Sequence, residues 1–216
     1  MFEAFYDFDL TLVNWGNAAL KGAGVVLTPL FRAITFLGEL GWFFVVASLF
    51  LLLFRKTRRA GAVAIVAIAL GAVFSNLILK NAVARPRPFA DENSPFYELW
   101  VQAGGVSEGE YSFPSGHATA SMAFAVALVF TLNKKVSWLA LLIPLVMGFT
   151  RIYFVVHFAS DVLFGYLVGA CCAVAAWVVV KLLARWKLFA NYLEAEGIVD
   201  LVRDRKARKK KVEQEK

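Results

Sequence analysis

The sequence predicts an all-α protein, a polytopic bundle of five to six transmembrane helices. Of its 216 residues, 60% are hydrophobic, and the mean hydropathy is +0.64. It contains 20 phenylalanines, more than a soluble domain of this length needs to fill one core. The composition therefore argues against an ordinary soluble domain and indicates an integral membrane protein.

Five apolar runs supply the expected spans. They are residues 40–54, 60–79, 115–132, 136–150 and 158–183. Most are close to, or slightly shorter than, the roughly 20 residues that cross a bilayer as a helix. The short runs are expected to extend into flanking polar residues or to border a thinned part of the bilayer.

The N-terminal segment, residues 1–39, has a different pattern. Aromatic and aliphatic residues recur there at helical spacing among polar ones, which is typical of a helix lying in the membrane interface. Its start lacks the basic region of a secretory signal, so we expect it to be retained. Pro29 and Arg32 interrupt the apolar stretch 25–37, which is either a re-entrant segment or a sixth span. The predicted organisation is this segment, a transmembrane core at 40–187 and a basic tail at 188–216.

The basic residues predict the orientation, because they mark cytoplasmic loops. Of 23 Lys and Arg, four lie within 55–59, two are Lys134 and Lys135, and eleven lie from Lys181 onward. If these basic segments are cytoplasmic, five spans place loops 81–114 and 151–157 outside the cytoplasm. We therefore expect a multi-pass protein of the cell membrane with a cytoplasmic C-terminus.

Three sequence motifs then fall on the outer face. The first places Lys80 at the end of the second span and Arg87, followed by Pro88, seven residues later. Two helical turns would stack both cations on one helix face, although Pro86 is expected to end the helix first. No spacing ties Arg85 to the other residues, so we interpret it as reaching toward the lipid headgroups.

The second motif, PSGH at residues 114–117, opens the third span. The free N–H groups of a helix start, with Gly116 allowing close approach, form an anion-binding site. The third motif places Arg151 at the end of the fourth span and His157 and Asp161 at the start of the fifth. At this i, i+4 spacing, Asp161 can hold one ring nitrogen of His157 and leave the other free to attack.

Each feature also has a simpler interpretation. A lysine at a span end, such as Lys80, usually extends to the lipid headgroups. His157 and Asp161 could form a buried pair with a purely structural role. Three cations, a helix start, both histidines of the chain and a buried acid nevertheless meet on one membrane face. Ionisable residues at that depth are usually functional, so their joint occurrence favours an active site.

Together these motifs resemble the type II phosphatidic acid phosphatase family, whose pattern is K-x6-R-P, P-S-G-H and S-R-x5-H-x3-D. The match covers residues 80–161, and Thr150 stands where the family has Ser. The resemblance implies that His157 is a nucleophile that forms a phosphohistidine, with Asp161 fixing its tautomer. His117 would be the general acid and then the base.

The resemblance also implies how the phosphoryl oxygens are bound. Lys80, Arg87 and Arg151 would neutralise them, helped by the hydroxyl of Ser115 and the N–H groups around Gly116. No metal or other cofactor is expected, because no cluster of acids beside the histidines would hold Mg²⁺ or Zn²⁺.

The expected function is hydrolysis of a lipid phosphate or diphosphate at the membrane. Undecaprenyl diphosphate, phosphatidylglycerol phosphate, phosphatidic acid and a lipid A phosphate are all candidates, with an isoprenoid diphosphate favoured. The alternatives are a non-catalytic lipid transporter or scramblase, and vanadate-dependent peroxidase chemistry. The expected partners are the lipid substrate and the membrane, without nucleic acid, and no oligomeric state is predicted.

Overall fold

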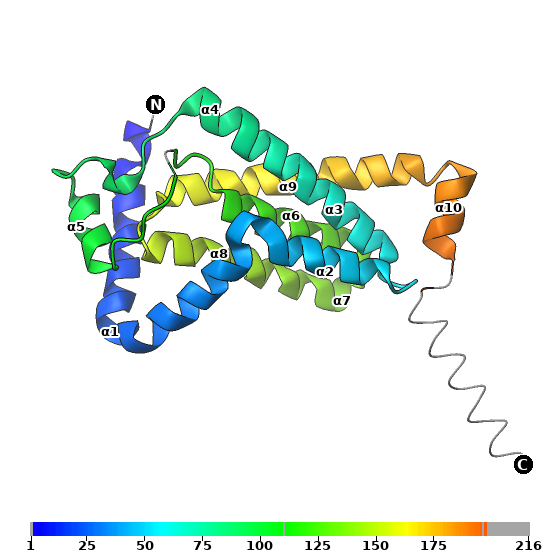
Figure 1. Cartoon of the computed structure of the whole chain (residues 1–216), viewed down its shortest axis with the longest axis horizontal. Helices are drawn as coiled ribbons and strands as arrows, with labels where there is room; N and C mark the ends of the chain where they lie inside the picture. The colour runs from blue at the N-terminus through cyan, green and yellow to red at the C-terminus, as the bar shows by residue number, and fades with distance from the viewer. Residues whose placement is uncertain (1, 110, 196, 198–216) are drawn as a thin grey trace, which may run out of the picture.

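The protein is a long bundle of helices, seen here in a computed structural model that describes residues 2–109, 111–195 and 197 (Figure 1). Within these residues no strand occurs, and only an isolated bridge pairs Pro86 with Tyr111. Four described helical stretches are long and apolar enough to cross a membrane, and α6 is a shorter apolar helix. The predicted all-α transmembrane bundle is confirmed.

The main helices are α1 (Tyr6–Gly38), α2 (Trp42–Leu52), α3 (Arg58–Ala72), α6 (Gly116–Thr131), α8 (Leu142–Tyr153) and α9 (Ala159–Leu183). The short α-helices are α4 (Lys80–Val83), α5 (Pro95–Gln102), α7 (Lys134–Ser137) and α10 (Lys187–Glu194). The 3₁₀ turns are η1 (Glu3–Phe5), η2 (Glu39–Gly41), η4 (Pro88–Ala90) and η5 (Trp138–Leu141), and η3 (Val73–Leu79) is a π-helix.

Helix α1 bends at Ala23, where the backbone leaves helical geometry (φ −143°, ψ 20°). Its first half crosses the end of the bundle, as expected for a helix lying along a membrane surface (Figure 1). Its second half turns into the bundle, and α2 continues beyond η2. The stretch 25–37 lies within one long candidate span, Glu3–Leu52, and the two expected alternatives for it, a re-entrant segment or a sixth span, both stay predictions. Pro29 lies inside the helix, and the backbone departs from helical geometry at Ala23 instead.

Helices α6 and α9 pack with their backbones almost in contact. A Cβ atom at Gly169 would lie 2.4 Å from the carbonyl oxygen of Thr119, and one at Gly165 would lie 2.8 Å from that of Ser115. Such small residues let membrane helices approach closely. The starts of α6 and α9 consequently lie together, and the Ser115 N–H donates to the Asp161 carbonyl at 3.1 Å. The fold thereby joins the second and third sequence motifs.

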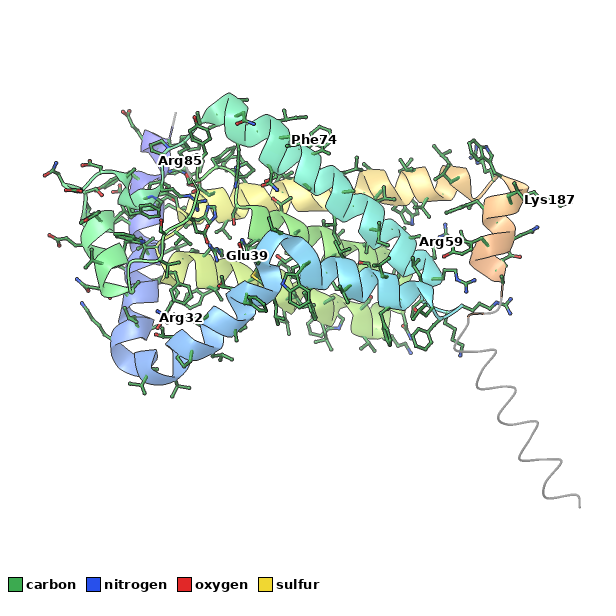
Figure 2. All side chains as sticks on the ribbon, viewed as in Figure 1. Arg32, Glu39, Arg59, Phe74, Arg85 and Lys187 are labelled. Atoms are coloured by element: carbon green, nitrogen blue, oxygen red, sulfur yellow. The ribbon has the colours of Figure 1, made fainter. Side chains whose placement is uncertain are left out.

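The basic clusters gather at the end of the bundle away from these helix starts. Arg59 and Lys187 lie toward one end and Arg85 toward the other (Figure 2). Arg58 donates to the carbonyl oxygens of Tyr192 and Ala195, both at 2.6 Å, and so ties the start of α3 to α10. The remaining basic tail, 198–216, lies outside the described residues.

Candidate active site

A cavity of about 440 Å³ lies where the three motifs meet. Its lining includes residues from every motif: Lys80, Arg87, Gly116, His117 and His157. The loop at 106–109 and the turn η2 complete its wall. Segments that are far apart in the sequence thus line one cavity.

The first motif reaches the cavity by a broken helix. After the π-helix η3, the short α4 ends at Val83, and Ala84 adopts the left-handed conformation (φ 48°). Lys80 is therefore the last cation on the helix, and Arg87 enters from the loop beyond. The break before Pro86 occurs as expected, and the two cations meet through the loop rather than through one helix face.

The second motif forms the start of α6. Ser115 caps the helix, its hydroxyl oxygen accepting the Ala118 N–H at 3.4 Å, and it does not line the cavity. Gly116 packs closely on η3, since a Cβ there would lie 3.1 Å from Asn76 Oδ1. His117 follows, and its buried Nε2 has no hydrogen-bond partner among the described residues. The motif therefore supplies an imidazole nitrogen with free capacity and a serine that caps the helix, and the expected contact of Ser115 with phosphoryl oxygens stays a prediction.

The third motif turns sharply between α8 and α9. Val155 adopts a left-handed conformation (φ 54°), which is strained for a β-branched residue. The turn is held by Arg87, whose Nη1 donates to the Val156 carbonyl at 2.6 Å. Buried Arg151, near the end of α8, and His157 are thereby directed toward the same end of the bundle. The Thr150 hydroxyl, where the family has Ser, donates to the Met147 carbonyl at 2.7 Å.

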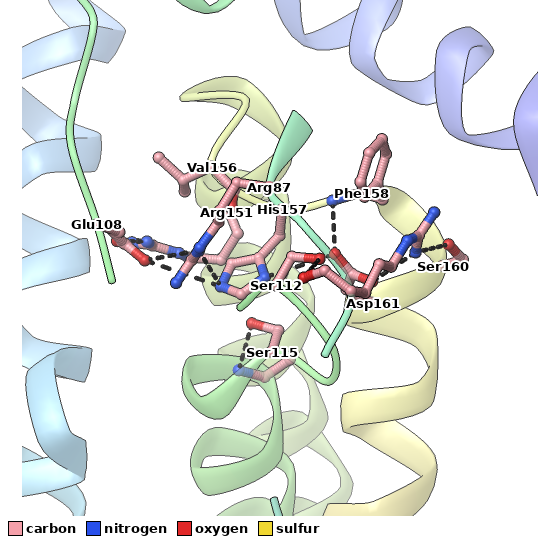
Figure 3. Close-up of polar contacts among 12 residues, drawn as sticks. Arg87, Glu108, Ser112, Ser115, Arg151, Val156, His157, Phe158, Ser160 and Asp161 are labelled. Carbon is pink, nitrogen blue, oxygen red and sulfur yellow. Dashed lines mark hydrogen bonds and ion pairs between the residues drawn. The ribbon is translucent and has the colours of Figure 1, made fainter. Parts of the chain in front are cut away.

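The two ring nitrogens of His157 have different surroundings (Figure 3). Nε2 lies 3.1 Å from Arg87 Nη1, which can donate to it only if that nitrogen is unprotonated. Nδ1 lies 3.7 Å from Asp161 Oδ2, an ion-pair distance rather than a hydrogen bond. Asp161 Oδ2 also accepts the Phe158 N–H at 2.9 Å. Nδ1 itself has no hydrogen-bond partner among the described residues, so the expected pairing of His157 with Asp161 stays a prediction, and such contacts are often long in substrate-free sites.

Glu108 is a site residue that the sequence did not reveal. Its carboxylate forms an ion pair with Arg151, lies 3.0 Å from Arg87 Nη1 and comes within 3.9 Å of His157 Nε2 (Figure 3). A carboxylate between two arginines, in front of the ring, occupies the position suited to a phosphoryl group. From the sequence it was only one of five acids in loop 91–110, which agreed with an outer location.

The interpretation of Arg85 as a residue reaching toward the headgroups is wrong. It is 7% exposed and forms ion pairs with Asp9 and Asp161. Two carboxylates satisfy its charge inside the protein, so it does not extend to the membrane surface. One available signal was Asp9 itself, an acid three residues before Leu12 and four after Phe5 on an otherwise apolar helix face.

Burial and neighbouring charges shift the pKa values of His157 and Arg87, whose side chains meet at His157 Nε2. Burial lowers the pKa of His157 well below its ordinary value, and the positive charges of Arg87 and Arg151 lower it further. These effects favour the neutral ring at pH 7. Burial lowers the pKa of Arg87 to about 10, which still leaves its guanidinium charged at that pH.

Fold and cavity define a membrane-spanning helical protein in which arginines and two histidines gather at one end of the bundle. In the described part of the chain, no group of three or more His, Cys, Asp or Glu residues is placed to hold a metal ion. Residues 60–185 match the PAP2 superfamily, and the chain belongs to that superfamily.

Its relatives include membrane lipid phosphatases. An undecaprenyl-diphosphatase of Sulfolobus acidocaldarius is 31% identical over 160 residues, 74% of this chain and 70% of that protein. A lipid A 4'-phosphatase of Bacteroides thetaiotaomicron is 32% identical over 142 residues, 62% of each protein. The crystal structure of Aquifex aeolicus LpxE superimposes with a TM-score of 0.62 at 27% identity, covering 77% of this chain and 93% of that one.

The protonation of His157 can be measured directly, because the chain has only two histidines. In tag-free His117→Gln protein, His157 gives the single imidazole signal in an NMR titration. We expect a midpoint below the ordinary value of about 6.5, since burial and two arginines disfavour the charged ring. Adding Arg87→Gln should raise the midpoint, and a midpoint above 6.5 in the first variant would contradict the proposed environment.

The position of Glu108 predicts competition with anions. Glu108→Gln removes the charge that occupies the arginine pair, so inorganic phosphate and vanadate should inhibit about tenfold more strongly, on the order of 1.4 kcal/mol. The matched control is Glu92→Gln, which makes the same charge change at an exposed position. Inhibition constants that are equal in both variants would show that Glu108 does not hold the anion position.

Proposed function

We propose that the protein is a lipid phosphate phosphatase that works through a phosphohistidine at His157. The observation that carries the proposal is the neutral Nε2 facing a carboxylate held between Arg87 and Arg151. A phosphoryl group in that position would have its negative charge neutralised and its phosphorus within reach of a nucleophile. A protein that only transports lipids would need the cations but not the two histidines.

In the first step, His157 Nε2 attacks phosphorus and the bond from phosphorus to the leaving oxygen breaks. His117, on the same cavity wall, gives its proton to that oxygen. As the ring of His157 becomes positive, the carboxylate of Asp161 beside Nδ1 stabilises it. The oxygens of the transferring group lie against Lys80, Arg87 and Arg151, whose charge offsets the negative charge of the transition state.

In the second step, a water molecule attacks phosphorus and the bond from Nε2 to phosphorus breaks. His117, now neutral, accepts the proton of that water and returns to its starting state. Inorganic phosphate leaves, and Glu108 can return to the arginine pair. Buried Arg87 and Arg151, with the partly buried Lys80, supply the charge stabilisation in this scheme, so it requires no added metal ion.

The substrate we favour is an isoprenoid diphosphate, with diacylglycerol phosphates next. A relative 31% identical over 160 residues is named an undecaprenyl-diphosphatase, which supports this choice. A diphosphate also offers a better leaving group than an alkyl phosphate. Relatives named lipid A phosphatases make a sugar-linked lipid phosphate the third candidate.

We further propose that the active site faces away from the cytoplasm. Support comes from the basic residues of the 55–59 loop and α10, which lie at the end of the bundle opposite the cavity. Basic loops stay on the cytoplasmic side during insertion. The C-terminus then lies in the cytoplasm.

The test of catalysis uses purified protein and a ³²P-labelled lipid phosphate. We expect His157→Ala to abolish turnover and to give no labelled enzyme. His117→Ala should lose about 10²–10⁴-fold in kcat because it lacks the general acid, yet still form labelled enzyme from an aryl phosphate with a good leaving group. EDTA should leave the wild-type rate unchanged, as should the nearby exposed change Asn81→Ala. Label retained in His157→Ala, or a strict requirement for Mg²⁺, would overturn the mechanism.

The orientation predicts which positions a membrane-impermeant thiol reagent reaches. With Cys171 and Cys172 replaced by alanine, Glu92→Cys should be labelled in intact cells. Lys134→Cys, at the opposite end of the bundle, should be labelled only after permeabilisation. Both positions are exposed in the fold, so accessibility alone does not separate them. The reverse pattern would place the site in the cytoplasm.

A further inference from the structure

Arg85 lies in a closed ionic cluster behind the catalytic histidine. Its Nη2 lies 2.9 Å from Asp9 Oδ2, and its Nη1 lies 2.5 Å from Asp161 Oδ1. The guanidinium also stacks between two rings, 4.0 Å from the centroid of Phe2 and 3.8 Å from that of Phe158. Rings on both faces and carboxylates on two edges leave it little freedom to move.

Asp9 brings the N-terminal helix into this cluster. Its Oδ1 accepts the backbone N–H of Ser160 at 2.7 Å, and its Oδ2 accepts the Ser160 hydroxyl at 2.8 Å as well as Arg85. Ser160 is in the first turn of α9, immediately before Asp161. A residue 151 positions away in the sequence thus fixes the helix turn that carries the histidine's partner.

The cluster determines how the carboxylate of Asp161 is oriented. One oxygen, Oδ1, is held by Arg85, and the other, Oδ2, by the Phe158 N–H at 2.9 Å. With both oxygens fixed, the carboxylate cannot rotate, and Oδ2 stays on the side of His157 Nδ1. We propose that Arg85 and Asp9 are positioning residues that act on the reaction through Asp161. This inference rests on the proposed function, because it assigns Asp161 the task of orienting and stabilising His157.

The charges in the cluster fit that task. Asp9, Arg85 and Asp161 together carry one negative charge, which is the charge needed opposite a ring that becomes positive. Without Asp9, Arg85 would be balanced by Asp161 alone, and the carboxylate would be less available to the ring. Without Arg85, two buried carboxylates would bind the same turn of α9 with no cation between them. Arg85→Ala is therefore a poor probe, because unfolding would hide its effect.

The test uses Asp9→Asn and Arg85→Lys, which keep the size or the sign of the groups they replace. In the full-length protein in detergent, we expect Asp9→Asn to lower kcat about tenfold and Arg85→Lys by about 10²-fold, the scale of a small misplacement of a reacting group. KM should stay within about twofold of wild type, because neither change touches the cations around the phosphate. A lysine ammonium cannot bridge two carboxylates as a guanidinium does, so we expect Arg85→Lys to keep the charge but only part of the wild-type kcat.

Two comparisons separate positioning from simple anchoring of α1. Asn17→Ala removes another tertiary contact of the same helix, a 3.2 Å hydrogen bond to Gln102, and should leave kcat unchanged. In an Asp161→Asn background, adding Asp9→Asn should change kcat by less than about twofold, because the carboxylate to be positioned is gone. Melting temperatures and vanadate-induced shifts confirm that each variant is folded.

The outcomes separate this inference from the proposed function. An unchanged kcat in Asp9→Asn and Arg85→Lys, with His157→Ala inactive, would overturn the inference and leave the function intact. The inference also fails if Asp9→Asn costs as much in the Asp161→Asn background as in wild type. Full activity of His157→Ala would instead overturn the proposed function.

Discussion

The burial of positive charge beside His157 is the constraint around which this structure is organised. Lys80, Arg87 and Arg151 converge on one region, where their mutual repulsion and loss of hydration must be offset. In the substrate-free state Glu108 offsets part of it, with its carboxylate on both arginines. Because Glu108 already neutralises part of the charge, the arginines are never left without an anion. A phosphate that binds here would replace the carboxylate. An acid beside these arginines thus has a physical reason to be there, whether or not the proposed phosphate binds.

Two groups of ion pairs meet at His157, one on the Nε2 side of the ring and one on the Nδ1 side. They differ in whether a ligand can reach them. On the Nε2 side, the anion comes from a loop and can be replaced, because the cavity is open to a ligand there. On the Nδ1 side, Asp161 is held by Arg85 and by a backbone N–H with no exchangeable partner. The ring is therefore set between a side that faces the cavity and a side that is closed by buried ion pairs.

The sequence could predict the parts of this arrangement that are local or periodic. Hydropathy located the helices, and fixed spacing located His117, His157 and three cations near one another. The sequence could not reveal the ion pair between Arg85 and Asp9, because a contact between residues 76 positions apart leaves no periodic pattern. Glu108 was missed for a similar reason, since one acid in an acidic loop looks like its neighbours until the loop folds over the arginines. Nothing in the sequence indicated the bend in α1 at Ala23, because the features that stood out there were Pro29 and Arg32, and Pro29 lies inside the helix.

The close approach of α6 and α9 explains why their first turns lie side by side next to the cavity. Gly165 and Gly169 let the two helices touch along their backbones, so both helices begin at the same level. The positive ends of their dipoles then lie near one cavity, where they favour negative charge in addition to the side-chain cations. The same cavity is walled by Gly41, Gly71 and Ala120 on its apolar side. Small side chains there leave room beside the helix starts, which is space that the proposed lipid phosphate requires.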